Sequence, residues 1–113
     1  MKILRFKERD AEEIGQRPFA VHGVSALHLG EGEGAAHAYV MHFRPGGLIG
    51  PHEAGFGQLF VALDGSGWVA GEDGDRRPLA QGQAAFISRG EVHSKGSDGG
   101  LTALMVQIWD FSV

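Results

Sequence analysis

The sequence predicts an all-β protein, and three observations support that prediction. Short segments rich in β-branched and aromatic residues recur along the chain, with the alternation typical of strands. The chain has 19 glycines among 113 residues, and they separate these segments as turns would. No segment has a sustained apolar period of 3.6 residues, so helices of any length are not expected. We therefore expect about eight to ten short strands in a sandwich or small barrel.

The N-terminal third contains two expected strands. The first covers residues 3–6 and is followed by a polar stretch, 7–18, with room for one helical turn. Residues 19–30 are rich in β-forming residues and predict the second strand. Residues 30–37, GEGEGAAH, are expected to form a hairpin loop. Their partial Gly-x-Gly pattern precedes no amphipathic helix, so a phosphate-binding loop is disfavoured.

The remaining strands follow in close succession. Residues 38–43 alternate between two faces, and an Arg-Pro-Gly-Gly sequence ends that strand. Residues 58–80 predict strands joined by tight turns, with Asp73-Gly74 as a type I′ hairpin turn. Residues 83–88 and 101–111 supply the last strands.

Two of these strands are apolar on both faces. Around residue 60, Phe60 and Ala62 share one face, whereas Leu59, Val61 and Leu63 share the other. A strand of a two-layer sandwich needs only one apolar face, so something must cover the second. The N-terminal strands or a second subunit could do so, and we expect a homodimer.

Composition excludes several functions. With 14 acidic and 10 basic residues the net charge is −4, which disfavours nucleic acid as a partner. The absence of cysteine excludes disulfides and thiolate chemistry. The charged N-terminus lacks the apolar stretch of a signal peptide, and no apolar run reaches the roughly 20 residues of a membrane helix. We expect a cytoplasmic protein with no membrane partner.

Two glycine- and histidine-containing segments carry a family resemblance. From Gly46 the chain reads GGLIGPHEAGFGQLFVALDG, and from Gly82 it reads GQAAFISRGEVHSKGS. Their spacing resembles the two sequence motifs of the cupin superfamily, in particular its small single-domain type-2 members. The matched positions are Gly46, His52, Gln58 and Gly65 in the first motif and Gly82, Gly90 and His93 in the second. The resemblance implies one domain over residues 1–113, folded as a cupin-type double-stranded β-helix, which is a jelly-roll barrel of two antiparallel sheets. The barrel core is expected at 40–108, with N-terminal strands and a loop at 1–35.

The resemblance also implies a metal site. Cupins bind a divalent metal through two histidines and a glutamate of the first motif and the histidine of the second. Here the implied ligands of a zinc, nickel, manganese or iron ion are His52, Gln58 and His93. Ala54 stands at the second histidine position and Gln58 at the glutamate position. His52, Ala54 and Gln58 share strand parity, so the pocket is expected to include Ala54, Phe60 and Ala62. Ser88 and Ser97 stand where the family has proline and asparagine.

The chemistry of this ligand set leaves the function open. Two imidazoles and an amide oxygen are neutral, so affinity for a divalent ion should be lower than in the family. We favour a cupin that binds a divalent metal through this incomplete set and acts on or binds a small organic molecule; if it is an enzyme, it would be a dioxygenase, isomerase or cyclase, with Glu91 as a candidate general base. The alternative is a metal-free cupin that binds a small molecule as a sensor or carrier. A third possibility is a dimer with no ligand, in which the two histidines are ordinary pocket residues.

Overall fold

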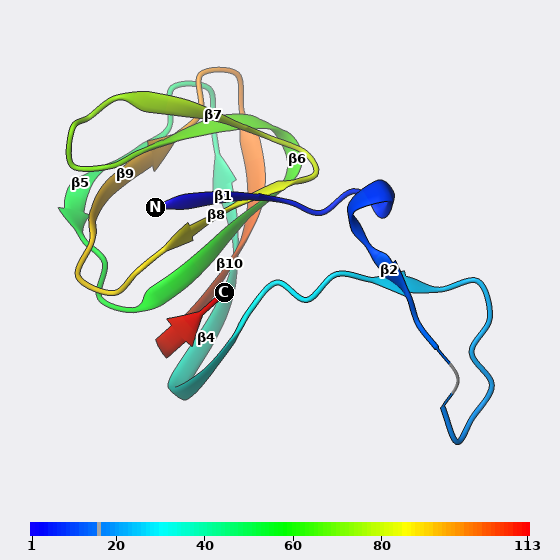
Figure 1. Ribbon diagram of the computed structural model, residues 1–113. Helices are drawn as coiled ribbons and strands as arrows, with labels where there is room; N and C mark the ends of the chain where they lie inside the picture. Colours follow the sequence, from blue (N-terminus) through cyan, green and yellow to red (C-terminus); the bar gives the residue numbers. More distant parts are fainter. Residues whose placement is uncertain (16) are drawn as a thin grey trace.

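The computed structural model describes residues 1–15 and 17–113 as two antiparallel layers that face each other, which confirms the predicted all-β jelly roll (Figure 1). One layer has the strand order β1-β8-β6-β10-β4. The other layer consists of β5, β9, the second half of β6, and β7. The strands are β1 (Lys2–Arg5), β2 (Glu12–Glu13), β3 (Ser25–Ala26), β4 (Glu31–Phe43), β5 (Leu48–Glu53), β6 (Gly57–Ala70), β7 (Arg76–Ala80), β8 (Gln83–Ile87), β9 (Val92–Gly96) and β10 (Leu101–Ser112).

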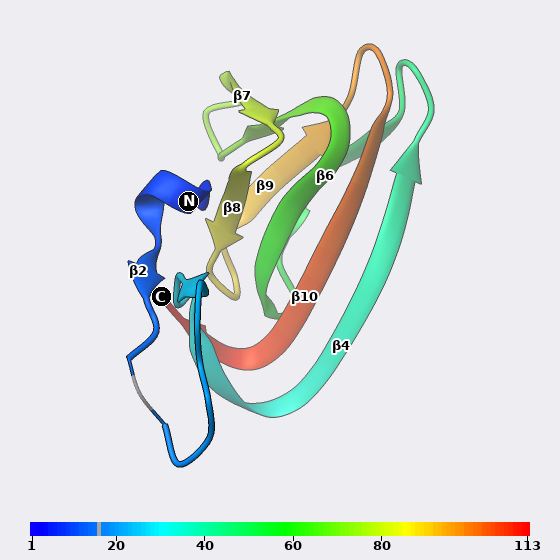
Figure 2. The ribbon, with the colours of Figure 1, turned by 90° about the vertical axis from the view of Figure 1, so that its right-hand side faces the viewer.

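Strand β6 connects the two layers. Its first half pairs with β8 and β10, and its second half pairs with β7 and β9. The change of partner occurs beside Gly65, which has a φ of 79°. A Cβ there would lie 2.3 Å from the carbonyl oxygen of Gly100, so only glycine fits this crossing. Figure 2 shows β4, β10 and β6 curving side by side.

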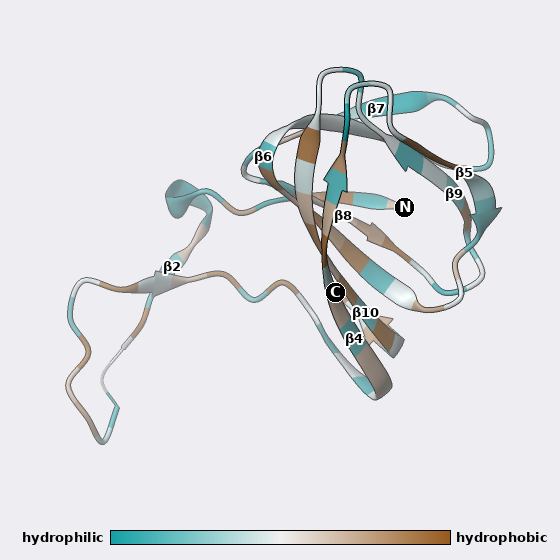
Figure 3. Cartoon of the chain, turned by 180° about the vertical axis from the view of Figure 1, so that it is seen from behind, coloured by the Kyte–Doolittle hydropathy of each residue, from teal (hydrophilic) through white to brown (hydrophobic). Residues whose placement is uncertain are grey.

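The space between the layers holds the main core. Strand alternation directs one set of apolar side chains inward, and brown apolar segments alternate with teal polar ones along β4 and β10 in Figure 3. The buried members of this inner cluster are Phe43, Phe60, Ala62, Val69, Leu79, Ala85, Leu101, Ala103 and Met105. The predicted inward direction of Phe60 and Ala62 is confirmed.

The outer face of the β6–β10 layer forms a second apolar cluster. Leu59, Val61 and Ala84 are buried there, and Leu4 and Phe6 pack against them from the N-terminal segment. The second apolar face is therefore covered in part by the chain itself. Leu63 and Val40 remain 46% and 59% exposed.

The predicted strand over residues 19–30 is wrong except at Ser25–Ala26. That two-residue strand pairs only with Glu12–Glu13, in an arm that stands away from the barrel (Figure 1). Strand formation needs a partner that completes the backbone hydrogen bonds, and sequence propensity cannot supply one. Phe19 on this arm is 65% exposed. The expected polar stretch does contain one turn, the 3₁₀ helix Glu8–Asp10, while its residue 16 lies outside the described part.

The predicted loop at residues 30–37 is also wrong, because β4 begins at Glu31 and pairs with β10 along its whole length. Its glycines accommodate a close approach between these strands. A Cβ on Gly32 would lie 2.4 Å from the carbonyl oxygen of Asp110. The register shifts between Ile108 and Asp110, so a bulge lies beside this contact.

The predicted turn at Asp73-Gly74 exists, but its type differs from the prediction. Gly74 has a φ of 77°, whereas Asp73 does not have a positive φ, and a type I′ turn requires both. The Gly74 N–H donates to the carbonyl oxygen of Gly71, so the tight turn closes one residue earlier. Among the described residues, no helix is long and apolar enough to cross a membrane.

Candidate functional site

The two motif histidines lie side by side. His52 on β5 and His93 on β9 are directly opposed in the strand register, and their ring centroids are 4.5 Å apart. His52 Nδ1 lies 2.8 Å from the carbonyl oxygen of Gly50, and His93 Nδ1 lies 3.4 Å from that of Glu91. With the proton on Nδ1, each ring donates to a backbone carbonyl and keeps its Nε2 lone pair free. His52 is exposed, whereas His93 is fully buried and its Nε2 has no hydrogen-bond partner.

Gln58, the third expected ligand, already has a partner. It is 2% exposed at the start of β6, and its Oε1 accepts a hydrogen bond of 2.5 Å from Lys95 Nζ. The same ammonium lies 3.5 Å from Met105 Sδ and 4.8 Å from the centroid of the Phe60 ring. Lys95 is itself 2% exposed. The cation therefore lies inside the barrel, against the residue at the family's glutamate position.

Sequence reasoning missed Lys95. A single lysine in a short strand is usually a surface residue, because its long stem lets the ammonium reach water. One signal was available: Lys95 follows His93 by two positions, so both must lie on the same face of β9. If His93 points inward, Lys95 points inward as well.

The charge of Lys95 has no acidic counterpart. Two ion pairs occur in the described part of the chain, Met1 with Glu91 and Arg76 with Asp98, and neither involves Lys95. Burial lowers the pKa of Lys95 to about 8, from an ordinary 10.5. Burial, followed by the charges of Lys95 and His52, lowers the pKa of His93 to about 4. At neutral pH the site therefore combines a neutral His93 imidazole with a mostly protonated Lys95.

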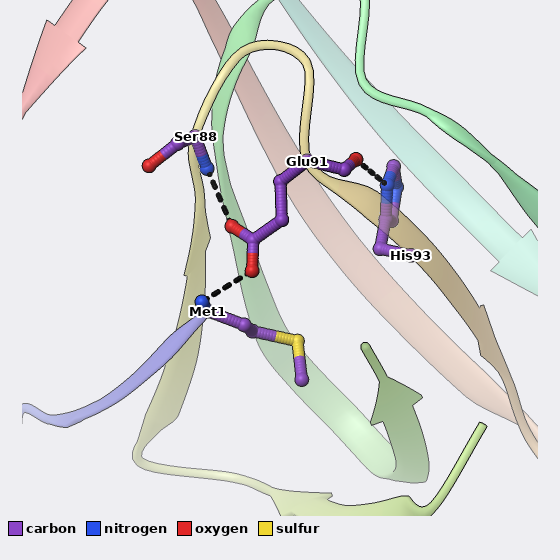
Figure 4. Close-up of polar contacts among 4 residues, drawn as sticks. All are labelled: Met1, Ser88, Glu91 and His93. Carbon is purple, nitrogen blue, oxygen red and sulfur yellow. Dashed lines mark hydrogen bonds and ion pairs between the residues drawn. The ribbon is translucent and has the colours of Figure 1, made fainter. Parts of the chain in front are cut away.

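Glu91 does not meet His93 as a base would. Its carboxylate accepts hydrogen bonds from the Met1 amino group and the Ser88 N–H, while its backbone carbonyl faces the imidazole (Figure 4). Partial burial raises the pKa of Glu91, but these two hydrogen bonds, together with the charges of the Met1 amino group and His93, leave the pKa below its ordinary value. The carboxylate fixes the turn before β9 and is turned away from His93.

Ala54 and Ser97 maintain the local structure around the site. Ala54 is 3% exposed. Its N–H donates to the backbone carbonyl of Glu91, and its own carbonyl accepts from the Gly90 N–H, so these bonds connect the loops before β6 and β9. Ser97 Oγ donates to the carbonyl of Ser66 and accepts from the Gly100 N–H. Serine thus completes a buried turn at the position where the resemblance expects asparagine.

Four aromatic side chains form what we call the aromatic wall: His37 and Tyr39 on β4, Phe56 in the loop before β6, and Trp109 on β10. The Phe56 ring lies edge-on to His37, with centroids 5.3 Å apart, and edge-on to Trp109, at 5.8 Å. His37 stacks on Tyr39 at 6.2 Å. Tyr39 and Trp109 are 47% and 49% exposed.

The expected three-ligand metal site does not fit this arrangement. A divalent ion bound to Gln58 Oε1 would lie within a few ångströms of the Lys95 ammonium, and like charges at such separations repel strongly in a buried site. No carboxylate compensates. Across residues 1–15 and 17–113, no cluster of three or more histidine, aspartate or glutamate side chains could hold a metal. Only His52 and His93 retain the geometry of ligands, each with its Nδ1 at a backbone carbonyl.

Comparison with known proteins supports the fold. No family model and no curated protein matches the chain. Among solved structures, it is similar to a cupin-like protein from Thermotoga maritima, with 22% identity, a TM-score of 0.62, and coverage of 66% of this chain and 57% of that one. A predicted oxalate decarboxylase from the same organism has 29% identity and a TM-score of 0.58, over 64% of each chain. A cupin superfamily protein from Desulfitobacterium hafniense has 14% identity and a TM-score of 0.61, over 88% of this chain and 98% of that one.

The chain therefore has the fold of the cupin superfamily, as its two motifs indicate. The match spans less than two thirds of each Thermotoga maritima protein. The likeness establishes the scaffold, and function must be argued from the site.

Proposed function

We propose that this protein is a metal-free cupin that binds a small organic anion inside the barrel. The observation that supports this proposal is the contact between Lys95 Nζ and Gln58 Oε1, because it brings a buried cation next to the residue that stands at the family's glutamate position. A buried ammonium without a carboxylate partner is costly, and an anionic ligand would offset that cost.

The neighbouring groups favour a ligand with a second polar function. Nε2 of His93 is buried and unpartnered, and as a lone pair it would accept a hydrogen bond from a ligand hydroxyl or N–H. Lys95 would donate to a carboxylate or carbonyl oxygen. Phe60 and Met105 surround these groups with apolar surface, which strengthens each polar contact.

Calorimetry can test the proposal with oxalate as the first probe, because one protein of similar fold is a predicted oxalate decarboxylase. We expect saturable binding by the wild type and at least a tenfold loss in Lys95→Met, since charge-assisted hydrogen bonds contribute about 1.5–3 kcal/mol. Lys7→Met, at an exposed lysine, is the matched control and should bind normally. Equal binding by Lys95→Met and the wild type would overturn the role of Lys95.

A metal held by His52 and His93 is the second candidate, and the unpartnered Nε2 of His93 favours it. Elemental analysis of tag-free protein separates the two. Near-stoichiometric metal that disappears in both His52→Ala and His93→Ala would replace the metal-free proposal. Protein without metal after incubation with excess divalent ions would support it.

We also propose that two copies associate through the partly covered outer face. Val40 and Leu63 leave apolar surface there, and an apolar patch of this kind favours self-association. Sedimentation should show a dimer for the wild type and a monomer for Val40→Asp combined with Leu63→Asp. A wild-type protein that stays monomeric at all concentrations would refute this assembly.

A further inference from the structure

Two members of the aromatic wall, His37 and Tyr39, lie on the same face of the sheet as Gln58. His37 on β4 is opposite Gln107 on β10, and Gln107 is opposite Gln58 on β6, so the three residues form one row across the inner face. The next row contains Tyr39, Met105 and Phe60. Lys95 Nζ contacts Gln58 in the first row and Met105 in the second, so it lies against both rows.

The strand register gives the separation of His37 and Gln58 across the inner face. Neighbouring strands are about 4.8 Å apart, so His37 and Gln58 are separated by about 10 Å across the sheet. No acidic side chain lies in either row. An anion bound at Lys95 would therefore meet no acidic side chain in these two rows, and Gln107 offers an amide between Gln58 and His37.

Trp109 is held in a fixed orientation. The Arg89 guanidinium lies 4.0 Å from the centroid of its ring and donates a hydrogen bond of 2.9 Å to its carbonyl oxygen. Trp109 lies within the bulge of β10, between Ile108 and Asp110, and a bulge changes the direction of the side chain it contains. A half-exposed indole fixed by a cation and by Phe56 is a rigid platform for another aromatic ring.

We propose that the barrel binds an aromatic carboxylic acid, with the ring against Phe56 and Trp109 and the carboxylate at Lys95 Nζ. This inference rests on the proposed function and adds the class of ligand. Independent support comes from the fully buried, unpartnered Nε2 of His93, which lies on the same face of β9 as Lys95. A ligand with a ring at one end and a carboxylate at the other would satisfy both parts of the site.

Three acids test the proposal: phenylpropionate, cyclohexylpropionate and propionate. Binding is followed by tryptophan fluorescence in Trp68→Phe, which leaves Trp109 as the sole indole. Trp68 stacks with Arg76 and lies on the opposite face of β6 from the inner core residue Val69, so this variant should bind like the wild type. We expect phenylpropionate to change Trp109 emission and to bind about tenfold more tightly than propionate, with cyclohexylpropionate between them.

Two further variants separate the ends of the site. Trp109→Leu should reduce phenylpropionate affinity to the level of propionate and leave propionate binding unchanged, whereas Lys95→Met should weaken the binding of all three acids.

Propionate binding that depends on Lys95, without a preference for phenylpropionate, would overturn this inference and leave the proposed function intact. Failure of all three acids, together with oxalate, to bind would overturn both. A change of oligomeric mass in Trp109→Leu without a change in phenylpropionate affinity would assign the aromatic wall to a subunit contact instead. Thermal unfolding checks that each variant is folded.

Discussion

The inner and outer faces of the β6–β10 layer are made from alternating residues of the same strands, but they differ in one respect. On the outer face, Leu59 and Val61 pack only against other apolar side chains, including Leu4. On the inner face, Phe60 packs in an equally apolar cluster but also borders the buried ammonium of Lys95. Apolar burial explains the packing of Leu59 and Val61 on the outer face. The inner face contains polar groups that stability does not require, and these are the groups that indicate a ligand.

The largest loss of stability should come from removing the Phe60 ring, which packs in the inner core and also borders the Lys95 ammonium. Phe60→Ala deletes a fully buried side chain and should lower the free energy of unfolding by about 3–5 kcal/mol. Leu63→Ala, on the outer face and half exposed, should cost well under half of that. Urea unfolding of both variants measures the difference, and equal losses would remove the distinction between the faces.

The buried charge of Lys95 should appear as alkaline stabilisation. Its pKa is about 8 when folded and 10.5 when unfolded, so the unfolded state binds more protons between these values and stability rises with pH. The full rise corresponds to about 3 kcal/mol. Urea unfolding at pH 7 and pH 10 should show most of it in the wild type. Lys95→Met should not show it, and a rise of equal size in that variant would assign the effect to another group.

The buried neutral imidazole of His93 should make the folded protein less stable in acid. Its pKa of about 4 in the folded state is below the ordinary 6.5, so stability is lost as pH falls from 6.5 towards 4. We expect a loss of about 2–3 kcal/mol that is absent in His93→Gln. The exposed His42, which contacts Thr102, provides the control His42→Gln, and this variant should keep the full loss. An unchanged acid profile in His93→Gln would contradict the burial of a neutral imidazole.

Ser97 differs from Lys95 and His93, because it is a buried polar residue with hydrogen-bond partners for its hydroxyl group. Ser97→Ala should lower the free energy of unfolding by about 1–2 kcal/mol through the lost contacts to Ser66 and Gly100. Anion binding and the pH profile should not change. Calorimetry with oxalate checks this, and a loss of binding comparable to Lys95→Met would show that the turn after β9 also shapes the site.

Local patterns predicted much of the fold. Alternation identified β6 and β10 and assigned Phe60 and Ala62 to the inner face, and motif spacing brought His52 and His93 together. Errors arose where a long-range partner decides the outcome. Residues 19–30 have strand propensity but almost no partner, and Gly32 lies in a strand because β10 approaches it closely.

The site was predicted only in part, for a related reason. The sequence identified His52, Gln58 and His93 as a set, but the partner of Gln58 depends on how β9 packs against the start of β6. Lys95 stands between the motif positions His93 and Ser97, at a position that the motif leaves unspecified, and its stem length allows either a surface or a buried position. The aromatic wall likewise brings together β4, β10 and a loop that are distant in sequence.

We infer that the Lys95 ammonium takes the place of the family's metal. Calorimetric titration of zinc and of oxalate, on the wild type and on a variant combining Ala54→His, Gln58→Glu and Lys95→Met, can decide this. We predict that the wild type binds oxalate and not zinc, and that the variant binds zinc, because it restores four ligands and removes the competing cation. Tight zinc binding by the wild type, abolished by His93→Ala, would contradict the claim.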